Sequence, residues 1–506
     1  MSSRGGGARL MLGFRGREPD ETFVRVLRES GARAAILFAR NLVDARQTRE
    51  LVAAIRGLVS WPLLIAIDQE GGAVVRLRRG ITVFPGNMAL AASGRVDLAA
   101  RQGQESGRQL AALGIDLNLA PVVDLQTNPR NPGIGIRSFG DDPERALALA
   151  RALIAGHREA GVACCLKHFP GKGAASVDAH YELPVLDRSL EEFRVPHLWV
   201  FEQLISDAEV IMSTHLVVRG LDAHNPATLS RAVVSDLLRG ELGFDGLTIS
   251  DDLEMGAIAR HRPVPEAALL AARAGHDLLP ICHDPERQLE AARVLDEALR
   301  EGELDQGAHE ASLERIEGLA ARSRPGPLRD PRPGDALARE IAAGSVHLFG
   351  DKRGLLPLGT AEDLLILVPC PAEALGVEEQ EDWAGSIRGC FRSEFPSAEL
   401  LDFATDLGPQ ESSILLDRAL EHERVLLLSW NAGREQGMRF LLEAACRTLA
   451  GRLIVAHLRN PFDQALVDPE VTALTAFGYR VVQLHALAAV LRGKNRPSGQ
   501  LPASVT

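Results

Sequence analysis

Cysteine is scarce in this sequence. Six cysteines are spread over 506 residues, and no two of them form a CxxC pair. Cys164 and Cys165 are adjacent, inside an apolar run. A disulfide scaffold needs a higher density of cysteine than this, and redox or zinc motifs need regularly spaced pairs. We therefore expect six reduced thiols, which is typical of a cytoplasmic protein.

Long apolar runs and basic clusters are also lacking. No stretch reaches the roughly 18 consecutive apolar residues of a membrane span. The N-terminal segment MSSRGGGARLMLGFRG has only a short apolar patch, too short for the core of a signal peptide. The net charge is −12, and Lys and Arg form no long run. We expect neither a membrane nor a nucleic acid as a partner.

The first two thirds of the chain alternate between two kinds of segment. Short runs rich in Val, Ile and Leu, without polar alternation, are typical of parallel strands buried on both faces. Segments of helical period lie between them. Eight such units predict a closed (β/α)8 TIM barrel. The predicted strands are residues 8–14, 34–39, 63–68, 115–123, 162–168, 209–215, 246–251 and 276–281; the helices are 21–30, 48–59, 98–113, 143–160, 190–205, 232–242, 265–274 and 285–300.

A proline-rich segment follows the barrel units. Residues 323–334 read SRPGPLRDPRPG, and four prolines in this stretch predict a semi-rigid linker. Beyond it, residues 364–368, 425–430 and 453–458 are three further candidates for buried strands. We predict a catalytic barrel over residues 1–322, a linker over 323–334, and a smaller open α/β sandwich domain over 335–506.

Polar residues gather where the predicted barrel strands end. Five successive strands, from the third to the seventh, end in ionisable or polar side chains, and the carboxyl ends of barrel strands are where active sites form. Burying charge at one end of a strand is costly unless that end faces a solvated site. We therefore predict a site at this rim. The side chains are Asp68, Asp124, Lys167, His168, His215, Ser250, Asp251 and Asp252.

Several kinds of chemistry are compatible with these residues taken alone. His168, His180 and His215 with Asp251 would form a zinc site, although no HExxH motif is present. Lys167 at a strand end is a possible Schiff-base lysine. The glycine-rich segment 131–140 is not a GxGxxG motif, and no GxSxG is found, which argues against a dinucleotide site and a serine nucleophile. Asp178 and His180, two residues apart, form a possible carboxylate–imidazole pair.

Taken together, the motifs resemble glycoside hydrolase family 3, and specifically its bacterial β-N-acetylglucosaminidase branch in the two-domain form. The resemblance is close from residue 11 to about residue 283 and weaker in segments 346–358, 458–463 and 493–505. It is carried by ILFARN (36–41), IAIDQEGG (65–72) with Arg76, RSFG (137–140), KHFPGKG (167–173) with DAH (178–180), and SDDLEM (250–255).

The resemblance implies a role for each matched residue. The position of Asp251 is that of the nucleophile, and His180 with its partner Asp178 is that of the acid/base. The branch usually has histidine between the two glycines where this chain has Lys172, so the geometry of this loop is an open question. The residues implied to bind the substrate are Asp68, Arg76, Arg137, Lys167, His168 and Met255.

The predicted function is that of a retaining, exo-acting β-N-acetylhexosaminidase that needs no metal or cofactor. Its substrate is a small carbohydrate with terminal β-linked N-acetylglucosamine, for example a peptidoglycan fragment, and its oligomeric state is monomer or homodimer. Three alternatives stay open: a β-N-acetylglucosaminide phosphorylase, a β-glucosidase, and a sugar-binding protein without turnover. Because the acid/base pair falls in the barrel, we expect the site not to need the second domain.

Overall fold

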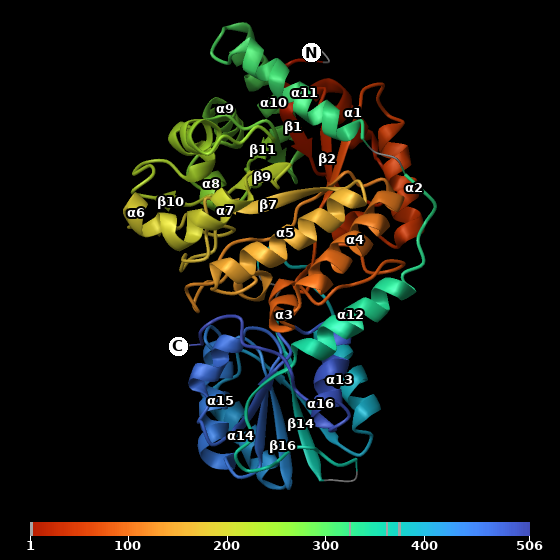
Figure 1. Ribbon diagram of the computed structural model, residues 1–506, viewed down its shortest axis with the longest axis vertical. Coiled ribbons are helices and arrows are strands. Elements are labelled where there is room, and N and C mark those ends of the chain that lie inside the picture. The colour runs from red at the N-terminus through yellow and green to blue at the C-terminus, as the bar shows by residue number, and fades with distance from the viewer. Residues whose placement is uncertain (1–3, 323–324, 361–362, 373–375, 506) are drawn as a thin grey trace.

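The computed structural model describes residues 4–322, 325–360, 363–372 and 376–505. Eight parallel strands form the first sheet in the order β11-β9-β7-β6-β3-β2-β1-β12, and a bridge between Ile249 and Leu278 closes it. The predicted closed barrel is therefore confirmed (Figure 1). The strands are β1 (Leu10–Leu12), β2 (Ala34–Leu37), β3 (Leu64–Ile67), β6 (Leu117–Asn118), β7 (Ala163–Phe169), β9 (Val210–Ser213), β11 (Leu247–Ile249) and β12 (Leu279–Ile281).

Helices surround the barrel at the positions predicted, with one break. The predicted helix 190–205 is interrupted at Val195, whose backbone is extended (φ −115°, ψ 122°). Val195 precedes Pro196, and the proline ring disfavours helical geometry at the residue before it. The helices of this part are α1 (Glu21–Ser30), α2 (Ala45–Arg56), α3 (Asn87–Ala92), α4 (Val96–Leu113), α5 (Pro143–Glu159), α6 (Leu190–Phe193), α7 (Trp199–Leu204), α8 (Gly256–Ala259), α9 (Val264–Ala274), α10 (Pro285–Arg300) and α11 (Gln306–Ala320).

Shorter elements complete this part of the chain. Turns of 3-10 type cover Gly6–Arg9, Ala39–Asn41, Gly135–Arg137 and Ala227–Leu229, and π-type turns cover Arg194–Leu198 and Ala232–Glu241. Small strand pairs join β4 (Gln69–Gly71) to β5 (Val74–Val75) and β8 (Val185–Leu186) to β10 (Val217–Val218). Strand β6 is much shorter than the predicted 115–123, because Pro121 has no N–H to donate to a neighbouring strand.

The interior of the barrel is a packed core that α11 closes at one end. Leu313 and Ile316 of α11 are fully buried and share a cluster with inward-facing strand residues such as Met11 and Ala66. Figure 1 places α11 at the end of the barrel away from the second domain. The barrel is thus sealed at its N-terminal end, and the opposite rim, where the strands end, is left to form the site.

The second part of the chain folds into a six-stranded sheet with the order β13-β18-β17-β16-β14-β15. Only β13 is antiparallel to its neighbour, and separate apolar clusters cover the two faces. The predicted open α/β sandwich is confirmed, with all three expected strands. The elements are β13 (His347–Gly350), β14 (Leu364–Cys370), β15 (Glu399–Ala404), β16 (Arg424–Ser429), β17 (Leu453–His457), β18 (Thr472–Thr475), α13 (Trp383–Glu394), α14 (Pro409–Leu420), α15 (Gln436–Leu449) and α16 (Val481–Leu491), with a 3-10 segment at Pro461–Leu466.

Helix α12 (Arg332–Ser345) joins the two parts and begins inside the predicted linker. A proline is tolerated in the first turn, where the missing N–H has no helical partner, so Pro333 does not prevent the helix. Helix α12 packs against α3 and α4 of the barrel and against α16 of the second domain. The division at residues 323–334 remains a prediction.

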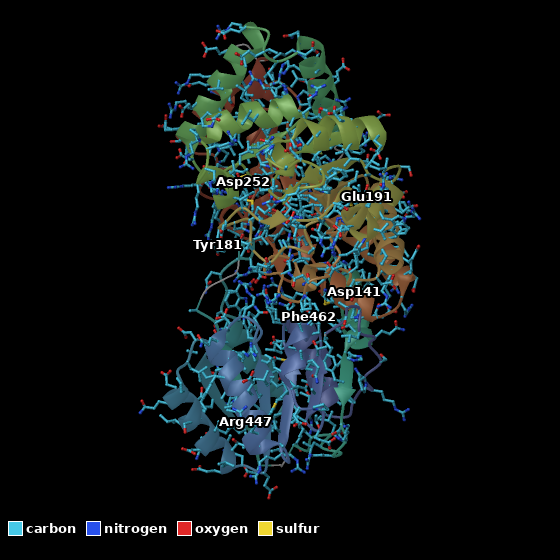
Figure 2. The ribbon with its side chains drawn as sticks, turned by 90° about the vertical axis from the view of Figure 1, so that its left-hand side faces the viewer. Asp141, Tyr181, Glu191, Asp252, Arg447 and Phe462 are labelled. Carbon is cyan, nitrogen blue, oxygen red and sulfur yellow. The ribbon has the colours of Figure 1, made fainter. Side chains whose placement is uncertain are left out.

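The two parts meet along an extensive contact. Figure 2 shows Asp141 and Phe462 where the barrel faces the second domain, and Phe462 shares an apolar cluster with Ile136 of the barrel. The segment 499–504 crosses back to the barrel. There the N–H of Asp141 donates to the carbonyl of Pro502 at 3.3 Å, and the N–H of Ser504 donates to the carboxylate of Asp141 at 2.7 Å.

The structure bears on two expectations from the composition, the state of the cysteines and the presence of membrane-spanning segments. All six cysteines are free, and five of them are buried. Within the residues that the structure describes, every helix is too short or too polar to cross a lipid bilayer.

Candidate active site

A cavity of about 390 Å³ opens at the carboxyl ends of the barrel strands. Eight of the nine predicted site residues line it, and the ninth, Asp178, is hydrogen-bonded to His180 at its edge. The structure therefore brings the predicted set together. The predicted residues in the lining are Asp68, Arg76, Arg137, Lys167, His168, His180, Asp251 and Met255.

The base of the cavity is a network of buried charges. Lys167 Nζ lies 2.8 Å from Asp68 Oδ1 and 2.7 Å from Glu70 Oε1. Arg137 makes a two-pronged contact with Glu70, at 2.9 and 2.8 Å. Burial acts to raise the pKa of Asp68, but Lys167 and Arg76 outweigh it and hold that pKa at about 2. These side chains are fixed before any ligand arrives, which is what hydroxyl recognition requires.

The side chain of Arg76 joins the cavity to the second domain. Its guanidinium lies 3.4 Å from Asp68 Oδ2 on one side. On the other side it donates to the carbonyl of Val377 at 2.7 Å and to Glu379 at 2.9 Å. Residues 376–379 also line the cavity. The second domain therefore forms part of the wall of the site, and the expectation that the site does not need this domain stays a prediction.

Asp251 follows β11 and faces Lys172 across the cavity. The Lys172 ammonium lies 3.9 Å from Asp251 Oδ2, and both side chains are largely buried. Burial alone would raise the pKa of Asp251, but Lys172, and beyond it His215 and His180, lower it below its ordinary value. Asp251 is therefore a carboxylate at neutral pH. Lys172 thus supplies a charge at the place where the family motif usually has histidine.

This contact makes a pH-dependent prediction. In Lys172→Met the opposing effect of the ammonium is gone, so burial raises the pKa of Asp251. If the ionised carboxylate is the active form, the acidic limb of the kcat/KM profile moves to higher pH, and activity is lost earlier as the pH falls. Lys172→Arg keeps the charge and is the matched control. An acidic limb that stays in place in Lys172→Met would exclude this role for Lys172.

Asp178 and His180 form the expected carboxylate–imidazole pair. His180 Nδ1 lies 2.7 Å from Asp178 Oδ1, and the backbone N–H of His180 donates to the same oxygen at 3.0 Å. Burial opposes ionisation of Asp178, but the hydrogen bonds with His180 hold its pKa well below the ordinary range. The carboxylate fixes the ring so that Nε2 is left for chemistry.

The segment that carries this pair is docked over the site. The N–H of Gly256 donates to the carbonyl of His180, and the N–H of Ala257 donates to that of Ala179, both at 3.0 Å. Met255 and Ala257 pack against Ala179 in a small apolar cluster. The segment thus rests on the chain that follows Asp251, and His180 and Asp251 face one cavity.

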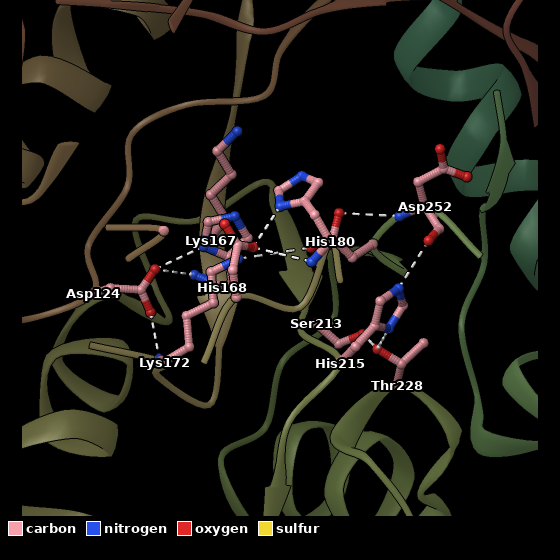
Figure 3. A network of polar contacts seen from close by, with 12 residues as sticks. Asp124, Lys167, His168, Lys172, His180, Ser213, His215, Thr228 and Asp252 are labelled. Atoms are coloured by element: carbon pink, nitrogen blue, oxygen red, sulfur yellow. Dashed lines mark hydrogen bonds and ion pairs between the residues drawn. The ribbon is translucent and has the colours of Figure 1, made fainter. Parts of the chain in front are cut away.

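Asp124 anchors the start of the same loop. Its carboxylate accepts from the backbone N–H of Lys172 at 2.7 Å and lies 2.7 Å from His168 Nδ1, as Figure 3 shows. Burial raises the pKa of Asp124 to about 6, whereas burial and three nearby cations lower the pKa of His168 well below its ordinary value. At neutral pH the His168 ring is therefore neutral, with its proton on Nδ1. Its Nε2 is therefore a hydrogen-bond acceptor.

Gly376 of the second domain touches the acid/base pair. A Cβ at this position would lie 2.8 Å from Asp178 Oδ2 and 2.9 Å from His180 Nδ1, and the backbone has φ +48°. For Gly376→Ala we expect kcat to fall about 10- to 100-fold, because the pair must shift. The comparison variant is Gly433→Ala, whose Cβ has no neighbour closer than 3.7 Å. Unchanged kcat in Gly376→Ala would mean that the segment does not hold the pair.

His215, one of the predicted strand-end residues, lies outside this arrangement. His215 is fully buried, with Nδ1 2.9 Å from Thr228 Oγ1 and Nε2 2.8 Å from the carbonyl of Asp252 (Figure 3). It supports the chain beside Asp251 and does not line the cavity. Among the described residues, no three His, Cys, Asp or Glu side chains are gathered in a way that would hold a metal ion.

The sequence did not single out several residues that the site uses. Glu70 was visible only as part of a motif, and its buried pairing with Arg137 and Lys167 depends on three distant strands meeting. Arg40 was likewise visible only as part of the ILFARN motif, and the segment 376–379 carried no signal of its own. A charged residue next to a barrel strand end was the available sign for Arg40, whereas nothing in the sequence links 376–379 to the barrel.

A buried carboxylate and a carboxylate-bound imidazole that face one cavity can supply the nucleophile and the proton donor that cleavage of a glycosidic bond needs. Comparison with known proteins gives the family. The model of the glycosyl hydrolase family 3 N-terminal domain matches residues 10–319. The chain belongs to glycoside hydrolase family 3, as its motifs indicated, and is a glycoside hydrolase.

Individual relatives agree with this assignment. A protein named β-hexosaminidase from Tolumonas auensis is 40% identical over 279 residues, which cover 54% of this chain and 83% of that protein. Another from Pseudomonas aeruginosa is 40% identical over 261 residues, covering 51% of this chain and 78% of the other. The structure of a family 3 β-N-acetylglucosaminidase from Paenibacillus sp. FPU-7 is similar over the whole chain and 99% of its own, with 32% identity and a TM-score of 0.93. The resemblance to the two-domain β-N-acetylglucosaminidase branch is confirmed.

Proposed function

We propose that this protein is a retaining, exo-acting β-N-acetylglucosaminidase. The observation that carries the proposal is the meeting of Asp251 with the His180–Asp178 pair at one cavity. The names of the β-hexosaminidase and β-N-acetylglucosaminidase relatives support the choice of sugar. No metal or cofactor has a part in the mechanism proposed here.

In the first step, the Asp251 carboxylate attacks the anomeric carbon. The bond to the leaving oxygen breaks as His180 donates its Nε2 proton to that oxygen, and a covalent glycosyl-aspartate forms. In the second step, the neutral ring takes a proton from water. The hydroxide attacks the anomeric carbon, and Asp251 leaves as a carboxylate. Two inversions at the same carbon give net retention.

We assign the charged residues at the base of the cavity to hydrogen bonding with the sugar hydroxyl groups. Asp68 is ionised and accepts hydrogen bonds, Arg137 and Lys167 donate them, and His168 Nε2 accepts. Arg76 lies beside Asp68 and is assigned to the same sugar. Because these groups are already paired and buried, they are set for the transition state without reorganisation. Met255 gives an apolar contact beside the dyad.

The test is a panel of nitrophenyl glycosides. We expect hydrolysis of the β-N-acetylglucosaminide and weak or no turnover of the β-glucoside. Retention is measured by NMR, which identifies the anomer of the sugar that is released first. Preferred turnover of the β-glucoside would favour the alternative of a β-glucosidase. No turnover of any member of the panel would favour a sugar-binding protein. Peptidoglycan fragments and chitin fragments are both compatible substrates. We also assign the enzyme to the cytoplasm.

Phosphorolysis is the second candidate, and one contact favours it. The Lys172 ammonium lies 3.9 Å from the nucleophile, and the acid/base is an imidazole that carries no fixed negative charge. A phosphate acceptor is thus attracted, where a glutamate acid/base would repel it. Phosphate would attack the glycosyl-aspartate in place of water and release the sugar 1-phosphate. We expect hydrolysis to dominate. A rate that rises with phosphate, with sugar 1-phosphate as product, would reverse that order.

A further inference from the structure

A second cavity adjoins the catalytic one. It has a volume of about 490 Å³ and lies between the start of α1, the start of α10 and the chain that follows β1 and β12. The two cavities share Glu254 and His283 in their linings. They therefore adjoin at the rim of the barrel, and the chain at these two residues forms a ridge between them.

The ridge is held by hydrogen bonds. The backbone N–H of His283 donates to Glu254 Oε2 at 2.6 Å, and His283 Nε2 lies 3.4 Å from Asp252 Oδ2. Arg40, in the catalytic cavity, donates at 2.8 Å to the carbonyls of both Phe14 and Cys282, which lie at the base of the ridge. The ridge between the two cavities is thus a built feature with hydrogen-bond partners on both sides.

Most charges of the second cavity already have partners inside the protein. Asp20 and Asp284 accept from the first backbone N–H groups of α1 and α10. Arg287 lies between Glu254, at 3.5 Å, and Asp284, at 3.4 Å. Phe14 and Phe23 stack at 4.4 Å beneath them. The lining carries Arg15 and Arg287 against Asp20, Asp284 and Glu254, so its charge is nearly balanced, and with its polar groups and ring edges it fits an uncharged polar ligand.

The ridge is less favourable to an anion. Asp252 and Glu254 stand close together there, and burial and then the charge of Asp252 raise the pKa of Glu254. A carboxylate crossing the ridge would come close to both. An uncharged sugar chain meets no such repulsion.

We infer that the second cavity binds the part of the leaving group beyond the first unit, and that this part is an uncharged sugar. This inference rests on the proposed function. It selects, among the substrates left open above, neutral oligomers of N-acetylglucosamine over fragments that carry lactyl or peptide carboxylates.

Substrate length and charge test the inference on the full chain. We expect kcat/KM for N-acetylchitotriose to exceed that for N-acetylchitobiose by about tenfold, or about 1.4 kcal/mol. Charge is tested with two trimers that are modified at the reducing end. Reduction gives the neutral alditol and oxidation gives the anionic aldonate, and both are open-chain at that end. The alditol is expected to be the better substrate.

A variant that fills the cavity tests the location. In Thr22→Trp, at the start of α1, we expect the ratio of kcat/KM for the trimer to that for the nitrophenyl glycoside to fall about tenfold. Glu29→Trp, on the same helix but outside the lining, is the matched control and keeps the ratio. The nitrophenyl glycoside has no second unit in its leaving group, so the ratio corrects for any general loss.

The outcomes separate the two proposals. An enzyme that hydrolyses the nitrophenyl glycoside but treats dimer and trimer alike would overturn the inference alone. So would a Thr22→Trp variant with an unchanged ratio, and a preference for the aldonate would overturn the assignment of an uncharged ligand. An enzyme without activity on any β-N-acetylglucosaminide would overturn the proposed function itself.

Discussion

Asp251→Asn is expected to lower kcat by about four orders of magnitude or more, the largest effect of any single change in this protein. The amide keeps the size of the side chain but is a very poor nucleophile. Loss of the carboxylate also removes the partner that faces the Lys172 ammonium. The measurement is kcat for the nitrophenyl β-N-acetylglucosaminide, with circular dichroism to show that the variant is folded.

A rescue experiment separates loss of the nucleophile from loss of structure. Asp251→Gly leaves a space below the anomeric carbon, and azide that enters this space attacks that carbon as the phenolate leaves. The product is the α-glycosyl azide, formed with a single inversion. Recovery of rate with this product identifies Asp251 as the nucleophile, whereas rescue that yields only the β-configured free sugar would contradict it.

His180→Ala is expected to lower kcat by about 10²- to 10⁴-fold, with a loss that depends on the leaving group. An acidic phenol leaves without a proton, so the nitrophenyl substrate should lose least and the disaccharide most. Asp178→Asn should lose less than His180→Ala on both substrates, because the ring remains but its orientation and tautomer are no longer fixed.

The control for His180→Ala is His224→Ala, which removes an exposed histidine outside the cavity. It should leave both substrates unaffected. Equal losses of His180→Ala on the phenol and on the sugar leaving group would argue against proton donation. In that case the role of His180 would be confined to binding.

Much of this architecture could be predicted from the sequence because the barrel strands are buried on both faces. Runs such as 63–68 and 162–168 have no polar alternation, and each ends in ionisable side chains. Those two features place Asp68 and Lys167 at one rim, where the structure finds them 2.8 Å apart. The strands of the second sheet that were found, β14, β16 and β17, have long apolar runs, whereas the fully buried β18 begins and ends with threonine and was missed.

The remainder depends on contacts between distant parts of the chain. Edge strands β13 and β15 are only partly buried, so they lack a continuous apolar run. The wall formed by 376–379 arises because the second domain docks on Arg76, some three hundred residues earlier in the chain. A motif can mark Lys172 as unusual, but only coordinates reveal that its ammonium faces Asp251. Local sequence patterns do not contain information about such long-range contacts.

The returning segment 499–504 has a consequence for how the enzyme is made. Its backbone is hydrogen-bonded to Ala92, the last residue of α3, and to Asp141, four residues after Arg137. During synthesis, these residues leave the ribosome after the strands of the barrel and of the second sheet. The barrel rim therefore receives this support only after the barrel strands have been made, and a nascent chain still lacking that segment has all of the side chains proposed to be catalytic but an unbraced rim.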